Sequence, residues 1–459
     1  MSESARDKTA AHPPGGVAEM LAMALPMVAS TSADTLMTFT DRLFLSKRGP
    51  EAMNAAMAGG LANFMAMTLF IGLISYTTAL AAQQLGAGSK PRAAQAAGQG
   101  LWLALAAWPL LLLLRPLAEP AFSHLGLDAA QLPLQVQYFR ILILGSGLGL
   151  LRGAFIGFFC GIGRTQVVMA SALTALGVNA LMAWLLIFGH WGLPALGIQG
   201  AAIGTIIGSC AGLVVMLLSA LAPRVRREFQ VLRALRFDRA LMLELLRRGA
   251  PSGLELFLNL LAFNLLIILF QAQGAAVATA TSIIFSWDMV SFVPLIGVEQ
   301  SVTSLVGRFV GSGDLASADK AAWSGIKLTW AFSSIIFALF VFFPGMLVAV
   351  FAPSAATPAF AQAAPLAVAM LRLASLYVLV QGALMVYTGA LRGAGDTLWA
   401  MLLTVAMHWC LVTAAWACLR LLRTGPLAAW ACVVATFVLF PILLRWRWKS
   451  KRWQGRMAA

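Results

Sequence analysis

Five carboxylates occur inside stretches of the sequence that are otherwise almost wholly apolar. They are Asp34, Asp41, Glu255, Asp288 and Glu299. An ionised side chain in hydrocarbon is costly, so acids at such positions are usually functional and mark the path of an ion, a proton or a substrate. The chemistry that they predict is therefore the binding of a proton, a metal cation or an organic cation.

The first two acids, Asp34 and Asp41, are separated by seven residues. In a helix this spacing is two turns, so both side chains are expected on one face with Thr38 between them. Two carboxylates close together in a low-dielectric cavity resist ionising together. We predict that one of the two acids takes up a proton.

The other three acids form a second group. Asp288 and Glu299 are eleven residues apart, which is about three helical turns, and are expected on one face. Glu255 follows Pro251 by four residues. Carboxylates, together with backbone carbonyls freed by Pro251 or Pro294, are the oxygen ligands that a hard cation prefers. The sequence thus leaves Na⁺ binding open beside proton binding.

The elements that carry these acids are predicted to be membrane-spanning helices. Of the 459 residues, 60% are hydrophobic and 11% are charged, whereas soluble proteins have about 45–50% apolar and about 25% charged residues. Because about 20 apolar residues cross a bilayer, the runs between breaks rich in Pro, Gly and Arg predict twelve helices. The predicted spans are roughly 18–45, 52–83, 94–116, 132–160, 167–190, 198–221, 250–272, 277–306, 323–351, 364–389, 398–423 and 425–445.

Basic residues are distributed unevenly between the predicted loops. With the N-terminus inside, they concentrate in the cytoplasmic segments, above all in 222–249 and in the tail 446–459. Lys and Arg accumulate in cytoplasmic loops of membrane proteins, and an even number of spans places both termini on that side. The net charge of +15 therefore reflects the topology of the chain in the membrane and does not predict nucleic-acid binding.

Five scattered cysteines without a CxxC pattern argue against a disulfide framework or a zinc site.

The sequence contains an internal repeat. At an offset of 225, residues 26–100 align without a gap with 251–325, and a second block aligns at an offset of 232. Matched positions include Pro26/Pro251, Gly49/Gly274, Thr78/Thr303, Gly88/Gly313, Gly100/Gly325, Gly157/Gly389 and Gly163/Gly395. Six helices per copy give two lobes of the same orientation, as in secondary transporters that rock around a midplane site.

The predicted spans and the repeat divide the chain into five parts. They are a polar cytoplasmic N-terminus (1–17), an N-lobe (18–221), a basic cytoplasmic linker (222–249), a C-lobe (250–445) and a basic cytoplasmic tail (446–459). The apolar residues of the linker interleave with its arginines, which suits a surface on anionic headgroups.

Several local motifs appear in a characteristic order. They are FTDRLF (39–44), GAGSKPRAAQAAG (86–98), GVN (177–179), GIQGAAIGT (197–205) and GALRGAGDT (389–397). Over 18–445 the chain resembles the multidrug and toxic compound extrusion (MATE) family. The resemblance implies an all-α membrane protein whose two six-helix repeats form a V-shaped, alternating-access transporter. It also implies export of amphipathic, mostly cationic compounds in exchange for inward H⁺ or Na⁺, with no cofactor, by a monomer in the bacterial inner membrane.

The resemblance assigns roles to residues of both lobes. Asp41 falls on the aspartate of the family's N-lobe coupling site, whose partners map to Asn179 and Thr205. Related sequences often carry an acid four residues after that asparagine, where this chain has Ala183. The resemblance therefore implies that the hydrogen-bond network around Asp41 has one acid fewer here. We expect Asp34 to supplement this network.

In the C-lobe, Glu255 resembles the helix 7 glutamate that sodium-coupled relatives place in their cation site. Those relatives often have an acid on helix 10 where this chain has Gln381. Glu255 is thus a candidate Na⁺ ligand, with Asp288 or Glu299 as possible substitutes for the missing acid. Arg392 and Asp396, at the end of the same helix, are interpreted as a cytoplasmic cap and hinge.

Other functions lack their sequence signatures. The chain has no GxxxxGK[ST], HExxH or GxSxG motif, so neither direct use of ATP nor enzymatic activity is expected. A lipid-linked oligosaccharide flippase of the same two-lobe fold stays open as an alternative, but its anionic substrate would need a cationic cavity. Because the intramembrane candidates are mostly acidic, we predict a multidrug efflux antiporter for cations.

Overall fold

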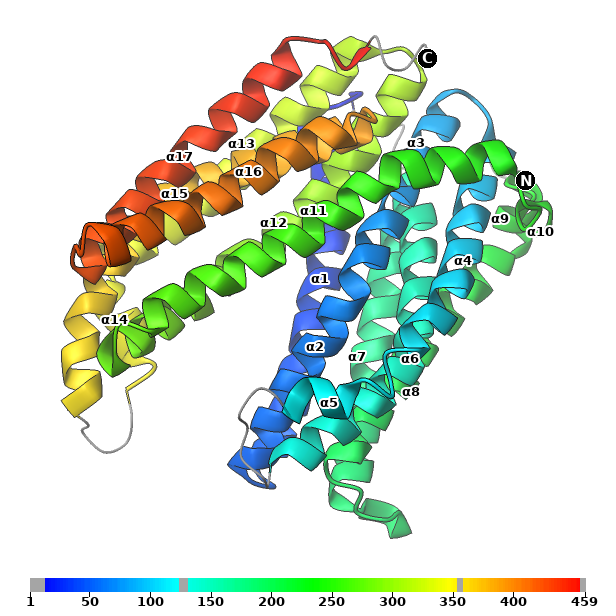
Figure 1. Ribbon diagram of the computed structural model, residues 1–459. Helices are drawn as coiled ribbons and strands as arrows, with labels where there is room; N and C mark the ends of the chain where they lie inside the picture. The colour runs from blue at the N-terminus through cyan, green and yellow to red at the C-terminus, as the bar shows by residue number, and fades with distance from the viewer. Residues whose placement is uncertain (1–12, 124–130, 353–357, 455–459) are drawn as a thin grey trace. The chain divides into compact units, whose positions relative to one another are not determined.

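The computed structural model describes residues 13–123, 131–352 and 358–454, and within these ranges all regular structure is helical. The long helices follow the apolar runs of the sequence, and short helices such as α5, α9 and α10 lie in the connections between them (Figure 1). The helices are α1 (Val17–Ser46), α2 (Pro50–Ser75), α3 (Thr77–Gly86), α4 (Lys90–Leu112), α5 (Ala118–Ser123), α6 (Gln131–Gly161), α7 (Thr165–Phe188), η2 (His190–Gly192), α8 (Ile198–Leu221), α9 (Pro223–Glu228), α10 (Val231–Ala234), α11 (Arg239–Gln271), α12 (Ala275–Gly311), α13 (Leu315–Phe342), α14 (Pro344–Ala349), α15 (Pro358–Gly393), α16 (Thr397–Trp416), η3 (Ala417–Leu421) and α17 (Pro426–Lys449).

The predicted membrane spans correspond to these helices. Among the described residues, eleven helices are long and apolar enough to cross a membrane, with α2 and α3 acting as one span and η3 extending α16. The remaining predicted span, 94–116, falls on α4, whose first half carries Lys90, Arg92, Gln95 and Gln99 and is therefore more polar. The all-α, polytopic architecture expected from composition is confirmed.

The chain divides into two compact units. We call the first the N-unit; it comprises Met23–Leu254 with Gly307–Asp314. The second, the C-unit, comprises Glu255–Val306, the described residues from Leu315 onward, and those up to Ala22. The predicted linker, 222–249, contains α9, α10 and the first part of α11, which begins at Arg239 and continues through Gly249 without a break. Only the short helices α9 and α10 and the few residues around them connect α8 to α11.

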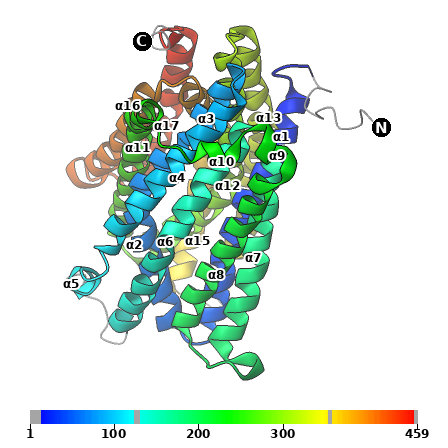
Figure 2. The same cartoon turned by 90° about the vertical axis from the view of Figure 1, so that its right-hand side faces the viewer.

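Helices α7 and α8 form the closest helix pair of the N-unit (Figure 2). Glycines of α8 make the approach possible: a Cβ added at Gly204 would lie 2.9 Å from the backbone nitrogen of Ala183 on α7, and one at Gly208 would lie 2.7 Å from the carbonyl oxygen of Ala175. Helix α6 packs against α2, α4 and α8. This packing holds α7 and α8, which carry Asn179 and Thr205, firmly against each other.

In the C-unit, α15 packs against both α13 and α17 (Figure 1). Trp430 of α17 is buried at the centre of the apolar core, in edge contact with Phe270 and Tyr377. At the junction of α15 and α16, the buried Asp396 carboxylate pairs with Arg447 Nε at 2.7 Å. Asp396 stands at the N-cap position of α16 as predicted, but its side chain makes no cap hydrogen bond there and instead ties this junction to α17 through the ion pair.

The internal repeat is visible in the local packing of each unit. Gly100 would meet Thr77 and Ala154 if it carried a Cβ, and its counterpart Gly325 would meet Val302 and Val386, the repeat equivalents of those two residues. Matched glycines also share a backbone conformation: φ is positive at Gly49 and Gly274, at Gly88 and Gly313, and at Gly163 and Gly395. A side chain at these turns would be strained, which explains why both copies keep glycine there.

Candidate functional site

Three side chains from three helices of the N-unit meet at Asp41. Asp41 lies on α1 and is 5% exposed. The Thr205 hydroxyl on α8 donates a hydrogen bond to Asp41 Oδ2 at 2.7 Å. Asn179 Nδ2 on α7 lies 3.2 Å from Oδ1 and 3.4 Å from Oδ2 of the same carboxylate. The structure therefore brings together the three residues that the family resemblance assigned to one site.

Two neighbours complete the surroundings of this site. Tyr138 of α6 is buried with its hydroxyl beside Asp41 and Thr205, and sequence reasoning missed it because a single tyrosine in an apolar helix gives no signal. Ala183, where relatives often carry an acid, is fully buried against the backbone of Gly204. Ala183 thus lies within the tight contact of α7 and α8.

Asp34 does not join this site. Its carboxylate forms an ion pair with Arg152 of α6 at 2.9 Å, and its side chain is 41% exposed. Thr38, expected between the acids, donates its hydroxyl to the Asp34 carbonyl oxygen. Two helical turns separate the two acids by about 10 Å along the axis, and each has its own partners. The structure thus does not show a stacked carboxylate pair, and the supplementary role of Asp34 stays a prediction.

The position of Asn179 depends on the glycine opposite it. A Cβ at Gly208 would lie 2.7 Å from the Asn179 Cβ, so Gly208→Ala is expected to push α8 from α7 and loosen the contacts of Asp41. Because small displacements of positioned groups are costly, we expect ion-coupled transport in liposomes to fall about tenfold or more. Gly177→Ala is the matched control, since a Cβ at Gly177 meets open space. Equal activity of the two variants would contradict this positioning role.

In the C-unit, one guanidinium lies between two of the predicted acids. Arg392 Nη2 is 3.0 Å from Glu255 Oε2, and Arg392 Nη1 is 2.6 Å from Glu299 Oε1. The Thr404 hydroxyl on α16 donates to Glu255 Oε1 at 2.7 Å. His408 Nδ1 lies 2.8 Å from the carbonyl oxygen of Thr404, one turn earlier on α16. With both glutamates ionised, the three charged side chains carry a net charge of −1.

The interpretation of Arg392 as a cap and hinge is corrected by this geometry. The residue does stand in the last turn of α15, but its side chain reaches both glutamates and does not remain in solvent. Sequence position alone placed it at the helix end and gave no direction for a long, flexible side chain. Thr404 was also missed, since a threonine in an apolar helix is unremarkable.

Asp288 belongs to a different cluster from Glu299. Tyr377 of α15 donates its hydroxyl to Asp288 Oδ1 at 2.8 Å, and the amide of Gln381, one turn further along α15, faces the same carboxylate. Eleven residues span about 16 Å of helix, so a common face on α12 does not make a common site. The predicted group of Glu255, Asp288, Glu299 and Gln381 is therefore divided into two.

This division bears on the predicted Na⁺ site at Glu255. Within residues 13–123, 131–352 and 358–454, no three His, Cys, Asp or Glu side chains are grouped so that they could hold a metal ion. Arg392 already provides a positive charge to Glu255 and Glu299. A cation at Glu255 would have to share its carboxylate with that guanidinium.

Comparisons with known proteins agree with a membrane transporter built on this fold. The sequence model of the MatE family matches residues 26–185 and 251–414. A probable multidrug resistance protein NorM from Pseudomonas aeruginosa is 30% identical over 423 residues, which cover 88% of this chain and 83% of that protein. A protein of the same description from Mesorhizobium japonicum is 29% identical, covering 85% and 84%.

Solved structures show the same fold. A multidrug resistance MATE family transporter of the MOP superfamily, in an outward-facing conformation, has a TM-score of 0.85 and 20% identity, covering 96% of this chain and 97% of its own. A MOP superfamily transporter from Pyrococcus furiosus, described as having a binding pocket of reverse polarity, has a TM-score of 0.87 and 19% identity, with 96% coverage of both chains.

The helical fold and its internal repeat define the architecture of a multi-pass membrane transporter. The chain belongs to the MatE family, because the family model covers well over half of it in two successive blocks that coincide with the repeat. It is a multi-pass bacterial membrane transporter and not an enzyme.

Proposed function

We propose that the protein is a multidrug efflux antiporter that exports amphipathic, mostly cationic compounds in exchange for inward protons. The observation that carries the proposal is the buried hydrogen-bond network of Asp41, Asn179 and Thr205. The relatives described as probable multidrug resistance proteins support a drug substrate. An acid that is anionic when deprotonated would favour a cationic one.

The network can satisfy both protonation states of Asp41. Thr205 Oγ1 lies 2.7 Å from Asp41 Oδ2 and 3.0 Å from the carbonyl oxygen of Ala201. When Asp41 is ionised, the single hydroxyl hydrogen of Thr205 is donated to the carboxylate. When Asp41 is protonated, the acid donates to Thr205 and the hydroxyl turns to Ala201. Neither state leaves a buried donor of this pair without an acceptor, which would otherwise be costly.

Exchange follows if proton and drug compete for the ionised carboxylate. Inward-moving protons neutralise Asp41 and remove the charge that holds a cation, so the drug is released. Loss of the proton on the other side restores the anion for the next cation. The proposal places both termini in the cytoplasm, as the distribution of basic residues predicts, and assigns function to a monomer.

A proton is favoured over Na⁺ by the ligands that each site offers. Asp41 is a single carboxylate whose polar neighbours are the Asn179 amide and the hydroxyls of Thr205 and Tyr138, whereas Na⁺ is usually held by more than one charged or carbonyl oxygen. In the C-unit, Arg392 occupies the position between two glutamates where a cation would be attracted. Proton coupling needs only one carboxylate with a path to water.

The test uses the purified chain in liposomes with a fluorescent lipophilic cation. We expect a pH gradient to drive movement of the cation with Na⁺ absent throughout, and an imposed Na⁺ gradient at constant pH to drive none. Movement that requires the Na⁺ gradient would contradict the proton assignment. If neither gradient drives movement of any of several cations, the antiport proposal fails and the flippase alternative gains support.

A further inference from the structure

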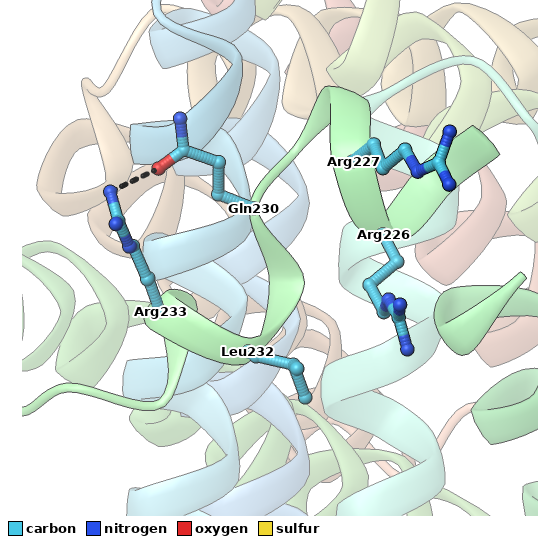
Figure 3. A pocket seen from close by; sticks show the side chains of 5 residues that line it. All are labelled: Arg226, Arg227, Gln230, Leu232 and Arg233. Atoms are coloured by element: carbon cyan, nitrogen blue, oxygen red, sulfur yellow. Dashed lines mark hydrogen bonds between the residues drawn. The ribbon is translucent and has the colours of Figure 1, made fainter. Parts of the chain in front are cut away.

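The short helices α9 and α10 enclose an open pocket on the surface of the N-unit. The pocket has a volume of about 360 Å³ and is lined by Arg226, Arg227, Gln230, Leu232 and Arg233 (Figure 3). All five side chains are exposed. None of the residues discussed for transport takes part in it.

The pocket rests on a backbone that is fixed to the N-unit. Val225, Phe229 and Ala234, on the opposite side of the segment, are buried, and the Phe229 ring makes an edge contact with Phe158 of α6. From α4, Trp102 Nε1 donates to the carbonyl oxygen of Leu235 at 2.9 Å. The connection between α8 and α11 thus packs against α4 and α6 of the N-unit.

The arginines of the pocket lack acidic partners. Glu228, the acid next to them, is already paired with Lys90 at 2.7 Å and lies 3.7 Å from Arg164. Within the part of the chain that the structure describes, Arg226, Arg227 and Arg233 form no ion pair, and the guanidinium of Arg233 donates to the amide oxygen of Gln230. The pocket is therefore lined by three positive charges, with Arg233 turned toward Gln230 on one side and Arg226 and Arg227 on the other (Figure 3).

Apolar side chains stand exposed beside these charges. Leu232 lies in the pocket wall and is 60% exposed, while Leu235 and Phe237 follow at 48% and 61%. Such residues next to arginines suit a ligand with an anionic head and an apolar tail. The segment directly follows the span α8 and precedes the span α11, so it lies at the level where lipid headgroups meet water.

We propose that this pocket binds the phosphate of an anionic phospholipid, with the acyl region lying along Leu232, Leu235 and Phe237. Guanidinium groups bind phosphate oxygens through paired hydrogen bonds, and basic residues near a membrane surface attract anionic lipids. A soluble phosphate would use the arginines equally well but would gain nothing from the apolar neighbours.

The experiment measures lipid binding to the full chain in detergent by native mass spectrometry, with phosphatidylglycerol and phosphatidylcholine at equal concentration. We expect preferential retention of phosphatidylglycerol. Arg226→Gln/Arg233→Gln removes two basic residues, each of which contributes about 1 kcal/mol near the surface, so the double variant is expected to weaken retention about thirtyfold. The matched control is Arg236→Gln/Arg239→Gln, which removes the same charge from exposed arginines of the same segment outside the pocket. Melting temperatures verify that both variants are folded.

Three results would overturn the proposal. The first is equal retention of the two lipids by the unaltered chain. The second is an equal loss in pocket and control variants, which would show diffuse attraction by net charge. The third is displacement of the lipid by inorganic phosphate at a similar concentration, which would show a site for soluble anions. Since none of these measurements involves transport, the result is independent of the antiport proposal.

Discussion

Replacing Asp41 by asparagine is expected to abolish transport of a lipophilic cation driven by a pH gradient. Asparagine preserves the size of the side chain and can still bond with Thr205 and Asn179, the partners that Asp41 has now, but it cannot exchange a proton or carry a negative charge. The measurement is the initial rate in liposomes, and we expect it to fall to that of protein-free liposomes.

Asp34→Asn is the matched control, because it makes the same chemical change on the same helix. Asp34 is paired with Arg152 and is partly exposed, so its loss removes an ion pair outside the Asp41 network. We expect this variant to retain a substantial fraction of the rate and its dependence on the pH gradient. A gradient-driven rate that survives in Asp41→Asn and disappears in Asp34→Asn would transfer the coupling role to Asp34.

Replacing Arg392 by glutamine is expected to cause the largest loss of stability. The change leaves Glu255 and Glu299, both buried, without the guanidinium that now contacts each of them. Removing one side of a buried ion pair typically costs about 3–5 kcal/mol. We expect a clearly lower melting temperature in detergent at neutral pH, because two buried carboxylates then lack a compensating charge.

Glutamine variants of the acids provide the control for this prediction. Glu299→Gln leaves Arg392 paired with Glu255 one to one, so it is expected to change the melting temperature far less than Arg392→Gln. The double variant Glu299→Gln/Arg392→Gln leaves a single acid bonded to Thr404 and is expected to recover part of the loss. A double variant less stable than Arg392→Gln alone would contradict the electrostatic explanation.

The candidate sites could be predicted only in part from the sequence. Asp41, Asn179 and Thr205 were named together through the family motifs, and the structure places them in contact. Spacing along a helix was less reliable. It placed Asp34 with Asp41 and Asp288 with Glu299, yet each of these acids has its main partner on another helix.

The sequence by itself determined the apolar spans, the internal repeat and the glycines at equivalent turns. Each of these depends on local chemistry: hydrocarbon length selects the helices, and a positive φ selects glycine at positions such as Gly88 and Gly313. The tertiary structure alone decided the partners of the charged residues. A helical period fixes the face of a side chain but not the helix that packs against it. Arg392 could therefore be placed at a helix end from the sequence, but its position between Glu255 and Glu299 follows only from the packing of α11, α12 and α15.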